Sequence, residues 1–339
     1  MKKTAIAYVL FYFLSSSIVF AQNNTNDFYD DSKMYNLQVA KIQVLGEVEN
    51  KGTVKFSKLP KRSIIVKETE INKDNLSFIG TYCYEGYSLY DILNKRIIKK
   101  RKDNTFNPII DLYVEIINQK GESTILSWGE LYYPSNRHKI IIATNVRRII
   151  PSKESQLWPL PKKAKLVVAM DLISERNISN PIKIIVHSAK CSLVVRKNIS
   201  PIFSPKISIY NGDTLLTEIQ KYPLDLQTQN YLTVFYGRGR GIHGISEFKG
   251  VALKEILKPY FPQSKENIKN GLFIVGAQDG YRGVFTYSEI FNRNDQSETL
   301  LINRGETDGG KFSLFPSADF FSDRAIKSVT DIIYKNTKI

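Results

Sequence analysis

The feature that most constrains the fold of this chain is an internal repeat. The pattern Gly-x-x-Leu-x-x-Ile-Leu occurs at Gly86–Leu93 and again at Gly250–Leu257. Each copy is followed by a strand-like apolar run, a turn glycine and a short segment that contains a glutamate, Glu130 or Glu289. Several elements that recur in one order at similar spacing are typical of a duplicated unit. The sequence therefore predicts two related halves, each with one obvious helix that begins after the glycine.

The remaining repeated elements predict the fold class. Short apolar runs bounded by glycine and turn residues favour strands, so we expect an α+β fold with mixed or antiparallel curved sheets and few helices. We predict that each half also ends in an equivalent alternating apolar segment. The matched segments are Leu112–Ile117 with Leu272–Val275, Ile140–Ile142 with Leu300–Ile302, and Pro181–Val186 with Lys311–Phe315.

The amino-terminal residues have the pattern of a secretory signal. Lys2 and Lys3 precede a short apolar run, and a small-residue cleavage site ends at Ala21. An uncleaved anchor is the alternative, although a spanning helix needs about 20 apolar residues. We therefore predict a periplasmic or secreted protein with no integral membrane segment after signal removal. The expected organisation is a signal peptide at 1–21, a flexible lead-in at 22–36, a first domain at 37–197 and a second domain at 207–339.

Composition excludes a disordered chain, a collagen-like fibre and a disulfide-dense miniprotein. The 339 residues include 48 Lys and Arg against 33 Asp and Glu, and 42% are hydrophobic, as in an ordinary globular protein. Two cysteines and three histidines leave little for a thiolate zinc cluster. The basic run Lys95–Lys102 could meet nucleic acid, but we interpret it as a solvated helix end and expect no nucleic-acid partner. Whether Cys83 and Cys191 form a disulfide is left open by the sequence.

The second half carries motifs of a known family. Gly250–Leu257 is followed by Gln278–Tyr281, then by Phe285–Ile290, and the chain closes on Asp323–Lys327. In this order the motifs resemble the molybdopterin-binding domain of the sulfite oxidase family, and the first half is a more divergent copy. The resemblance implies an oxidoreductase in which a cysteine thiolate and a pterin dithiolene hold molybdenum. The segment Val234–Lys249, where this family has its ligand cysteine, contains none, and Cys83 in the weaker copy is the remaining candidate metal ligand.

The segment Tyr236–Gly244 has the composition of an anion-binding loop. It places four glycines, two arginines and a histidine in nine residues. Glycine allows the backbone to approach a ligand, and arginine supplies planar donors that suit phosphate or carboxylate. A solvated hairpin loop is the alternative interpretation. The predicted cofactor-binding residues are Gly237, Arg238, Gly239, Arg240, His243, Tyr281, Arg324 and Lys327.

Several of these residues also have a structural interpretation. His243 is the histidine of the loop, and a lone surface histidine is the commoner case. Arg324 and Lys327 would close on the same anion or lie on an exposed terminal element. Asp279–Arg282 is typical of a turn, with a ligand contact from Tyr281 as the alternative. Glu130 and Glu289 recur at matching positions, which indicates a repeated cap or hydrogen bond and not a catalytic pair.

Two functions follow from these residues. The first is an exported molybdopterin-binding oxidoreductase-like protein that acts on a small oxyanion or oxide. Its partners would be a small anionic ligand or the pterin itself, together with a redox partner protein. The alternative is a non-catalytic binding or scaffold protein that retains the fold and has lost the ligand cysteine. The absence of cysteine from Val234–Lys249 is the feature that the alternative predicts.

Overall fold

The structure is a computed structural model. It describes residues 32–73, 75–150, 155–196, 198–199, 202–237, 241–305 and 309–338, without the side chain of His243. The predicted signal peptide at 1–21 and most of the predicted lead-in lie outside the described residues. We call the described residues up to 196 the first half and those from 202 onward the second half.

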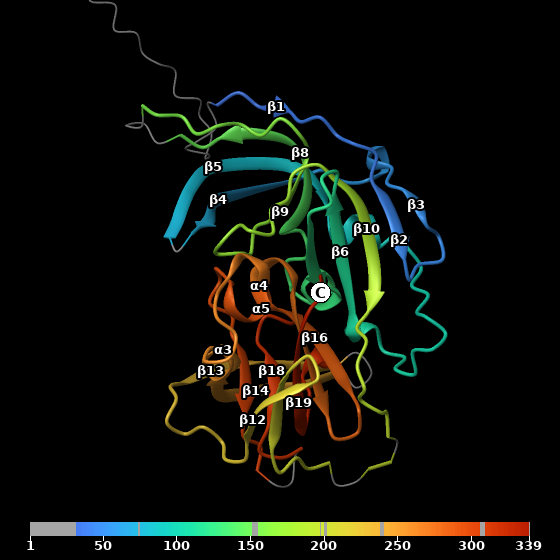
Figure 1. Ribbon diagram of the computed structural model, residues 1–339, viewed down its shortest axis with the longest axis vertical. Coiled ribbons are helices and arrows are strands. Elements are labelled where there is room, and N and C mark those ends of the chain that lie inside the picture. Colours follow the sequence, from blue (N-terminus) through green and yellow to red (C-terminus); the bar gives the residue numbers. More distant parts are fainter. Residues whose placement is uncertain are drawn as a thin grey trace, which may run out of the picture.

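The described chain is mostly β-sheet, as the sequence predicts, with five short α-helices and four sheets (Figure 1). Each half contains two sheets. We call the sheet built on a long two-stranded hairpin the hairpin sheet, and the one that includes a parallel pair the mixed sheet. The helices are α1 (Leu89–Leu93), α2 (Trp128–Tyr132), α3 (Leu253–Leu257), α4 (Lys265–Asn270) and α5 (Tyr287–Phe291), and the 3-10 turns are η1 (Phe56–Lys58), η2 (Ile109–Asp111) and η3 (Ser322–Arg324).

The first half has ten strands. Its hairpin sheet contains β1 (Tyr35–Asn36), β4 (Arg62–Asn72), β5 (Asn75–Ser88), β8 (Ile140–Arg148) and β9 (Lys165–Val168). Its mixed sheet contains β2 (Gln43–Gly46), β3 (Gly52–Thr53), β6 (Leu112–Asn118), β7 (Ser123–Ser127) and β10 (Pro181–Ser188).

The second half has nine described strands. Its mixed sheet contains β11 (Ile207–Asn211), β12 (Thr214–Ile219), β15 (Gly271–Ala277), β16 (Arg282–Thr286) and β19 (Val329–Asn336). Its hairpin sheet contains β13 (Thr228–Gly237), β14 (Gly241–Ala252), β17 (Thr299–Ile302) and β18 (Ser313–Pro316).

The two halves have the same strand order. The mixed sheets run β3-β2-β10-β6-β7 and β12-β11-β19-β15-β16. In the first half β10 pairs in parallel with β2 and antiparallel with β6. In the second half β19 pairs in the same way, in parallel with β11 and antiparallel with β15. The hairpin sheets share the order β4-β5-β8-β9 and β13-β14-β17-β18. The repeat in the sequence therefore corresponds to a repeat in topology.

One matched pair of segments was wrong. Pro181–Val186 belongs to β10, the central strand of the first mixed sheet, whose equivalent in strand order is β19. Lys311–Phe315 instead overlaps β18 in the hairpin sheet, whose equivalent is β9. The two segments are both short and apolar, and this pattern cannot distinguish the strands of two sheets that pack on one core.

The repeated glycines belong to strands and not to helix starts. Gly86 lies in β5 and Gly250 in β14, and the helices begin only at Leu89 and Leu253. A Cβ atom on Gly86 would lie 2.0 Å from the carbonyl oxygen of Ile142, and one on Gly250 would lie 2.3 Å from that of Leu301. Both glycines are thus required because a neighbouring strand approaches closely.

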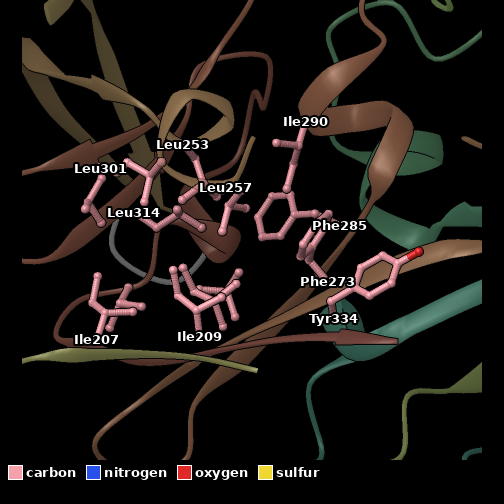
Figure 2. Close-up of a cluster of buried hydrophobic side chains, with 14 of the residues drawn as sticks. Ile207, Ile209, Leu253, Leu257, Phe273, Phe285, Ile290, Leu301, Leu314 and Tyr334 are labelled. Carbon is pink, nitrogen blue, oxygen red and sulfur yellow. The ribbon is translucent and has the colours of Figure 1, made fainter. Parts of the chain in front are cut away.

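The apolar positions of the repeat form the cores. In the second half, helix α3 and strands from both sheets contribute side chains to one buried cluster (Figure 2). The first half has an equivalent cluster that includes Leu89, Ile92 and Leu93 of α1. Burial of such a side chain stabilises a fold by about 1.5–3 kcal/mol. Each half therefore has an apolar core with the helix as one wall, and Ile173 of the first half adds to the core of the second.

Two further local predictions can be compared with the structure. Asp279–Tyr281 forms the predicted turn, in which Gly280 has a φ of 77° and the Tyr281 amide donates to Asp279 Oδ1 over 2.9 Å. Lys95–Lys102, by contrast, is not a helix end, because α1 stops at Leu93 and Ile98 instead forms a β-bridge with Val48. No helix in the part of the chain that the structure describes is long and apolar enough to cross a membrane.

Candidate functional site

The two recurring glutamates each close a helix cap. In α2 the Ser127 hydroxyl accepts from the Glu130 amide over 2.9 Å, while Glu130 Oε1 accepts from the Ser127 amide over 2.7 Å. Thr286 and Glu289 form the same capping box at α5. The prediction of a repeated cap is therefore confirmed. Capping boxes satisfy two amide groups that a helix would otherwise leave without partners.

Each capping glutamate also binds a buried arginine. Arg176 donates to both oxygens of Glu130 over 2.9 Å, and to Asp171 over 2.6 and 2.8 Å. Arg324 likewise binds Glu289 and Asp319 in the second half, with both oxygens of Asp319 and one of Glu289. Both arginine side chains are buried, with 1–3% of their surface exposed, and each guanidinium group lies between two carboxylates. We call the six residues the junction network: Glu130, Asp171, Arg176, Glu289, Asp319 and Arg324.

The arginines also connect the two halves. Arg176 in the first half donates to Thr286 Oγ1 over 3.3 Å, and Arg324 in the second half donates to Ser127 Oγ over 3.2 Å. Each arginine therefore reaches the capping hydroxyl of the opposite half. The reciprocal geometry places the junction network where the amino-terminal caps of α2 and α5 meet, and the Thr286 hydroxyl there donates to Glu130 Oε1 over 3.4 Å. Helix α5 lies near the middle of the molecule in Figure 1.

Backbone contacts at the junction are reciprocal as well. The Leu172 amide donates to the carbonyl of Asn292, the cap residue at the end of α5, over 2.7 Å. The Phe320 amide donates to the carbonyl of Tyr133, which ends α2, also over 2.7 Å. Leu172 and Phe320 each follow the aspartate of the network. The two halves therefore hold each other by two copies of one set of contacts.

The junction network has an excess of carboxylates. Four carboxyl groups share two guanidinium groups, and the side chains of all six residues are almost fully buried. Burial raises the pKa of Glu130 to about 7, with the nearby Glu289 adding to the rise against the opposing effect of Arg176. Burial also raises the pKa of Asp171 and Asp319. Enclosing more acids than bases thus favours the protonated form of a carboxyl group in the junction network.

Arg324 therefore does not have the exposed position in which it could close on an anion with Lys327. Its Nη1 atom donates to Glu289 and its Nη2 atom to Asp319, each over 2.7 Å. Lys327, three residues later, is exposed, with its side chain beside Gly309. The structure thus separates the two cations that the sequence places together.

Tyr281 lies at the junction as well. Its hydroxyl donates to the carbonyl of Asp323 over 2.6 Å, and its ring meets that of Phe106 from the first half edge to face. The next residue, Arg282, stacks on the same Phe106 ring and approaches the buried Asp111. Tyr281 and Arg282 thus both contact the first half through Phe106.

The described ends of the predicted glycine-rich loop belong to β13 and β14, which pair antiparallel up to Gly237 and Gly241. Gly237 ends β13, and His243 belongs to β14 by its backbone. Arg238, Gly239 and Arg240 lie outside the described residues. The end of β13 next to these residues, and not the base of the hairpin, is close to η3, because the Tyr236 ring packs on those of Phe320 and Phe321.

The candidate molybdenum ligand, Cys83, lies inside a sheet. Cys83 lies in β5, between β4 and β8, and is 6% exposed with its Sγ atom 3.3 Å from Ser63 Oγ. Cys83 and Cys191 are both free thiols. No group of three or more His, Cys, Asp or Glu side chains that could hold a metal ion occurs among the described residues. The one candidate ligand is thus enclosed in a sheet, in the half opposite to Arg324.

A groove between the halves has the chemistry of a binding site. Its volume is about 530 Å³, and it separates the end of β10 from β15 and β19. Tyr113 and His187 stack along it with ring centroids 5.1 Å apart, and His187 Nε2 lies 3.2 Å from Glu115 Oε2. Ligand sites often lie between domains. The charged residues that line the groove are Arg101, Lys190 and Lys335, with Glu47 as the one carboxylate.

The groove residues were not predicted from the sequence as one site. The Lys335 ammonium donates to the carbonyl of Lys190 over 2.8 Å, although 145 positions separate them. Glu47 accepts from the Ser188 amide over 2.7 Å and from the Arg101 amide over 3.0 Å. These residues lie on four separate segments, so no local motif could have indicated the groove.

Comparison with known proteins adds no relative. No protein-family model matches the chain, and no curated protein matches it.

Proposed function

We propose that the protein is an exported, non-catalytic binding protein that holds a small anionic ligand between its two halves. The observation that carries the proposal is the groove, which is lined by Arg101, Lys190 and Lys335 and by one carboxylate, Glu47. Glu47 pairs with Arg101 over 3.5 Å, which leaves the two lysines as the excess positive charge. A cleft lined mainly by one sign of charge raises the local concentration of the opposite ion. The amino-terminal signal pattern supports export.

The position of Arg324 supports a binding role over a catalytic one. The family resemblance would use this arginine to hold a cofactor, but here Glu289 and Asp319 occupy its guanidinium group. The enclosed thiol of Cys83 supports the same conclusion. The fold implied by the resemblance would then serve as a rigid frame, and function would reside in the groove.

The binding test uses small anions as probes. Titration calorimetry with sulfate, phosphate and citrate should show saturable binding of at least one of them to the full chain. Lys190→Gln/Lys335→Gln should weaken that binding about tenfold or more, since each cation contributes a charge-assisted contact. The matched control is Lys338→Gln, an exposed lysine near the same end of the chain. Binding that survives the double variant unchanged would refute the groove as the site.

A second measurement tests the non-catalytic part of the proposal. The protein is purified from a host that makes and exports molybdenum cofactor, and molybdenum and pterin are measured per chain. We expect neither in stoichiometric amount. If the protein binds nearly one molybdenum per chain and the Cys83→Ser variant loses it, the proposal is overturned and the oxidoreductase hypothesis is favoured.

A further inference from the structure

A second cavity lies in the first half, away from the junction. It has a volume of about 340 Å³ and is formed by β3, the segment that follows it and the end of α1. Two separate stretches of chain meet there, 53–59 and 92–96. The Asn50 side chain joins them, since its Nδ2 donates to the carbonyl of Lys95 over 2.7 Å and its Oδ1 accepts from the Ile97 amide over 2.9 Å.

The rim of this cavity is cationic. Its lining includes Lys55, Lys58, Lys95 and Arg96, and none of its described lining residues is acidic. The nearby Lys99 has a carboxylate partner, Glu49, at 3.3 Å, but Glu49 does not line the cavity. Four like charges around one cavity repel each other, and an anion placed among them would relieve that repulsion.

Arg96 is fixed in place but incompletely paired. Its terminal nitrogens donate to the carbonyls of Asn50, Gly52 and Thr53, which are neutral acceptors. Its Nε atom is enclosed and has no hydrogen-bond partner among the described residues. Burial lowers the pKa of Arg96, in keeping with a guanidinium group that no carboxylate compensates. Arg96 is half-buried, so solvent offsets part of the cost of its missing carboxylate, and an anion in the cavity would supply the counterion.

The floor of the cavity is apolar. Val54 and Ile92 belong to the core of the first half, and Leu59 packs against it. Sites for small molecules combine an apolar lining with a few polar groups that fix the orientation of the ligand. A cationic rim over an apolar floor matches a molecule with an anionic head and an apolar tail.

We infer that this cavity binds an anionic amphiphile, with a carboxylate or phosphate head held by Lys55, Lys58 and Lys95 and a short apolar chain on Val54, Leu59 and Ile92. This site is separate from the groove of the proposed function, and either can fail alone. Arg96 is the positioning residue, since it ties the loop at Asn50 to the end of α1.

The test is calorimetric titration of the full chain with decanoate and with decyl phosphate, each as dispersed monomers. We expect one molecule per chain for at least one of the two, and the tighter of them identifies the head group. Lys55→Gln/Lys58→Gln should weaken this binding about tenfold, the equivalent of one charge-assisted contact. These lysines are exposed, so the variant should fold, and its melting temperature checks that.

Two controls locate the site. Lys102→Gln removes an exposed lysine of the same basic run outside the cavity lining, and Lys190→Gln/Lys335→Gln alters the groove only. Both should leave decanoate binding unchanged. Equal loss in either control, or unchanged binding in Lys55→Gln/Lys58→Gln, would overturn the assignment to this cavity.

Two further probes separate the head from the tail. Acetate carries the head group alone, and decanol carries the tail alone, so each should bind at least tenfold more weakly than decanoate. If acetate binds as well as decanoate, the apolar floor contributes nothing and the inference fails. If decanol binds as tightly as decanoate, the lysines do not hold the head group and the inference fails. If none of the probes binds, the site is refuted.

Discussion

The two halves share their strand order but differ in the segment that joins the mixed sheet to the hairpin sheet. In the first half this segment, 54–61, contributes two lysines to a cavity. In the second half the segment 220–227 places the Tyr222 hydroxyl between two strands, where it donates to Leu301 and accepts from Val251. At the junction, by contrast, the halves use the same contacts. A duplicated unit can thus vary at its periphery while its contact with the other copy stays the same.

The strongest test of this equivalence removes each buried arginine. Arg176→Met and Arg324→Met should each lower the free energy of unfolding by about 3–5 kcal/mol, because each leaves two buried carboxylates without their cation. Urea unfolding followed by circular dichroism measures the loss. Lys102→Met, at an exposed position, is the control and should change stability by less than about 0.5 kcal/mol. A large loss for one arginine and a small one for the other would show that the halves are not equivalent.

The excess of carboxylates at the junction predicts an unusual dependence on pH. The pKa of Glu130 is about 7 in the folded protein against 4.5 in the unfolded chain. The folded state therefore binds more protons between these values, and the free energy of unfolding falls as pH rises through that window, by about 3 kcal/mol for a fully formed shift.

The measurement compares urea unfolding of the wild type and Glu130→Gln from pH 4.5 to 7.5. Other carboxylates titrate in both proteins, so the difference between them isolates Glu130. The wild type should lose stability relative to the variant as pH rises. Parallel curves would show that Arg176 keeps Glu130 ionised throughout, against the burial that raises its pKa.

The two capping boxes, 127–130 and 286–289, share only their glutamate, and the residue before that glutamate gives a smaller effect. A Cβ atom on Gly129 would lie 2.1 Å from Arg324 Cζ, and that guanidinium group is fixed by two carboxylates. Gly129→Ala should lower the free energy of unfolding by about 2 kcal/mol through overpacking. The same position in α5 is Ser288, whose hydroxyl donates to the carbonyl of Ile268 over 3.2 Å.

Ser288→Ala is the matched variant and should cost about 1 kcal/mol, the value of one hydrogen bond. Both variants are measured by urea unfolding. If Gly129→Ala costs no more than Ser288→Ala, Arg324 has room to move, and the junction is less tightly packed than its contacts indicate.

The sequence predicted what depends on local pattern. The positions of Glu130 and Glu289 indicated caps, and the Asp279–Tyr281 turn followed from turn chemistry. The arginine partners were missed, although a signal was present. Asp171 with Arg176 and Asp319 with Arg324 have the same five-residue spacing, each soon after a short strand. The family resemblance instead predicts that Arg324 binds an anionic cofactor.

The candidate sites could not be predicted because they join distant segments. The groove needs residues from both halves, and the amphiphile cavity needs the end of α1 beside the chain that follows β3. The sequence shows that Lys95–Lys102 is a basic run. Only the fold shows that Lys95 and Arg96 of this run line a cavity. Lys100 of the same run instead pairs with the buried Asp111 over 2.6 Å.

The smallest expected effect tests the segment in which the halves differ. The Tyr222 hydroxyl donates to the Leu301 carbonyl over 2.6 Å and accepts from the Val251 amide over 3.1 Å, which ties the segment to β14 and β17. Tyr222→Phe keeps the ring and removes both bonds, so it should lower the free energy of unfolding by about 1 kcal/mol in urea. Tyr260→Phe, on an exposed ring, is the control. If Tyr222→Phe costs nothing, the apolar packing of Leu226 holds the segment, and the hydroxyl does not explain why the halves differ here.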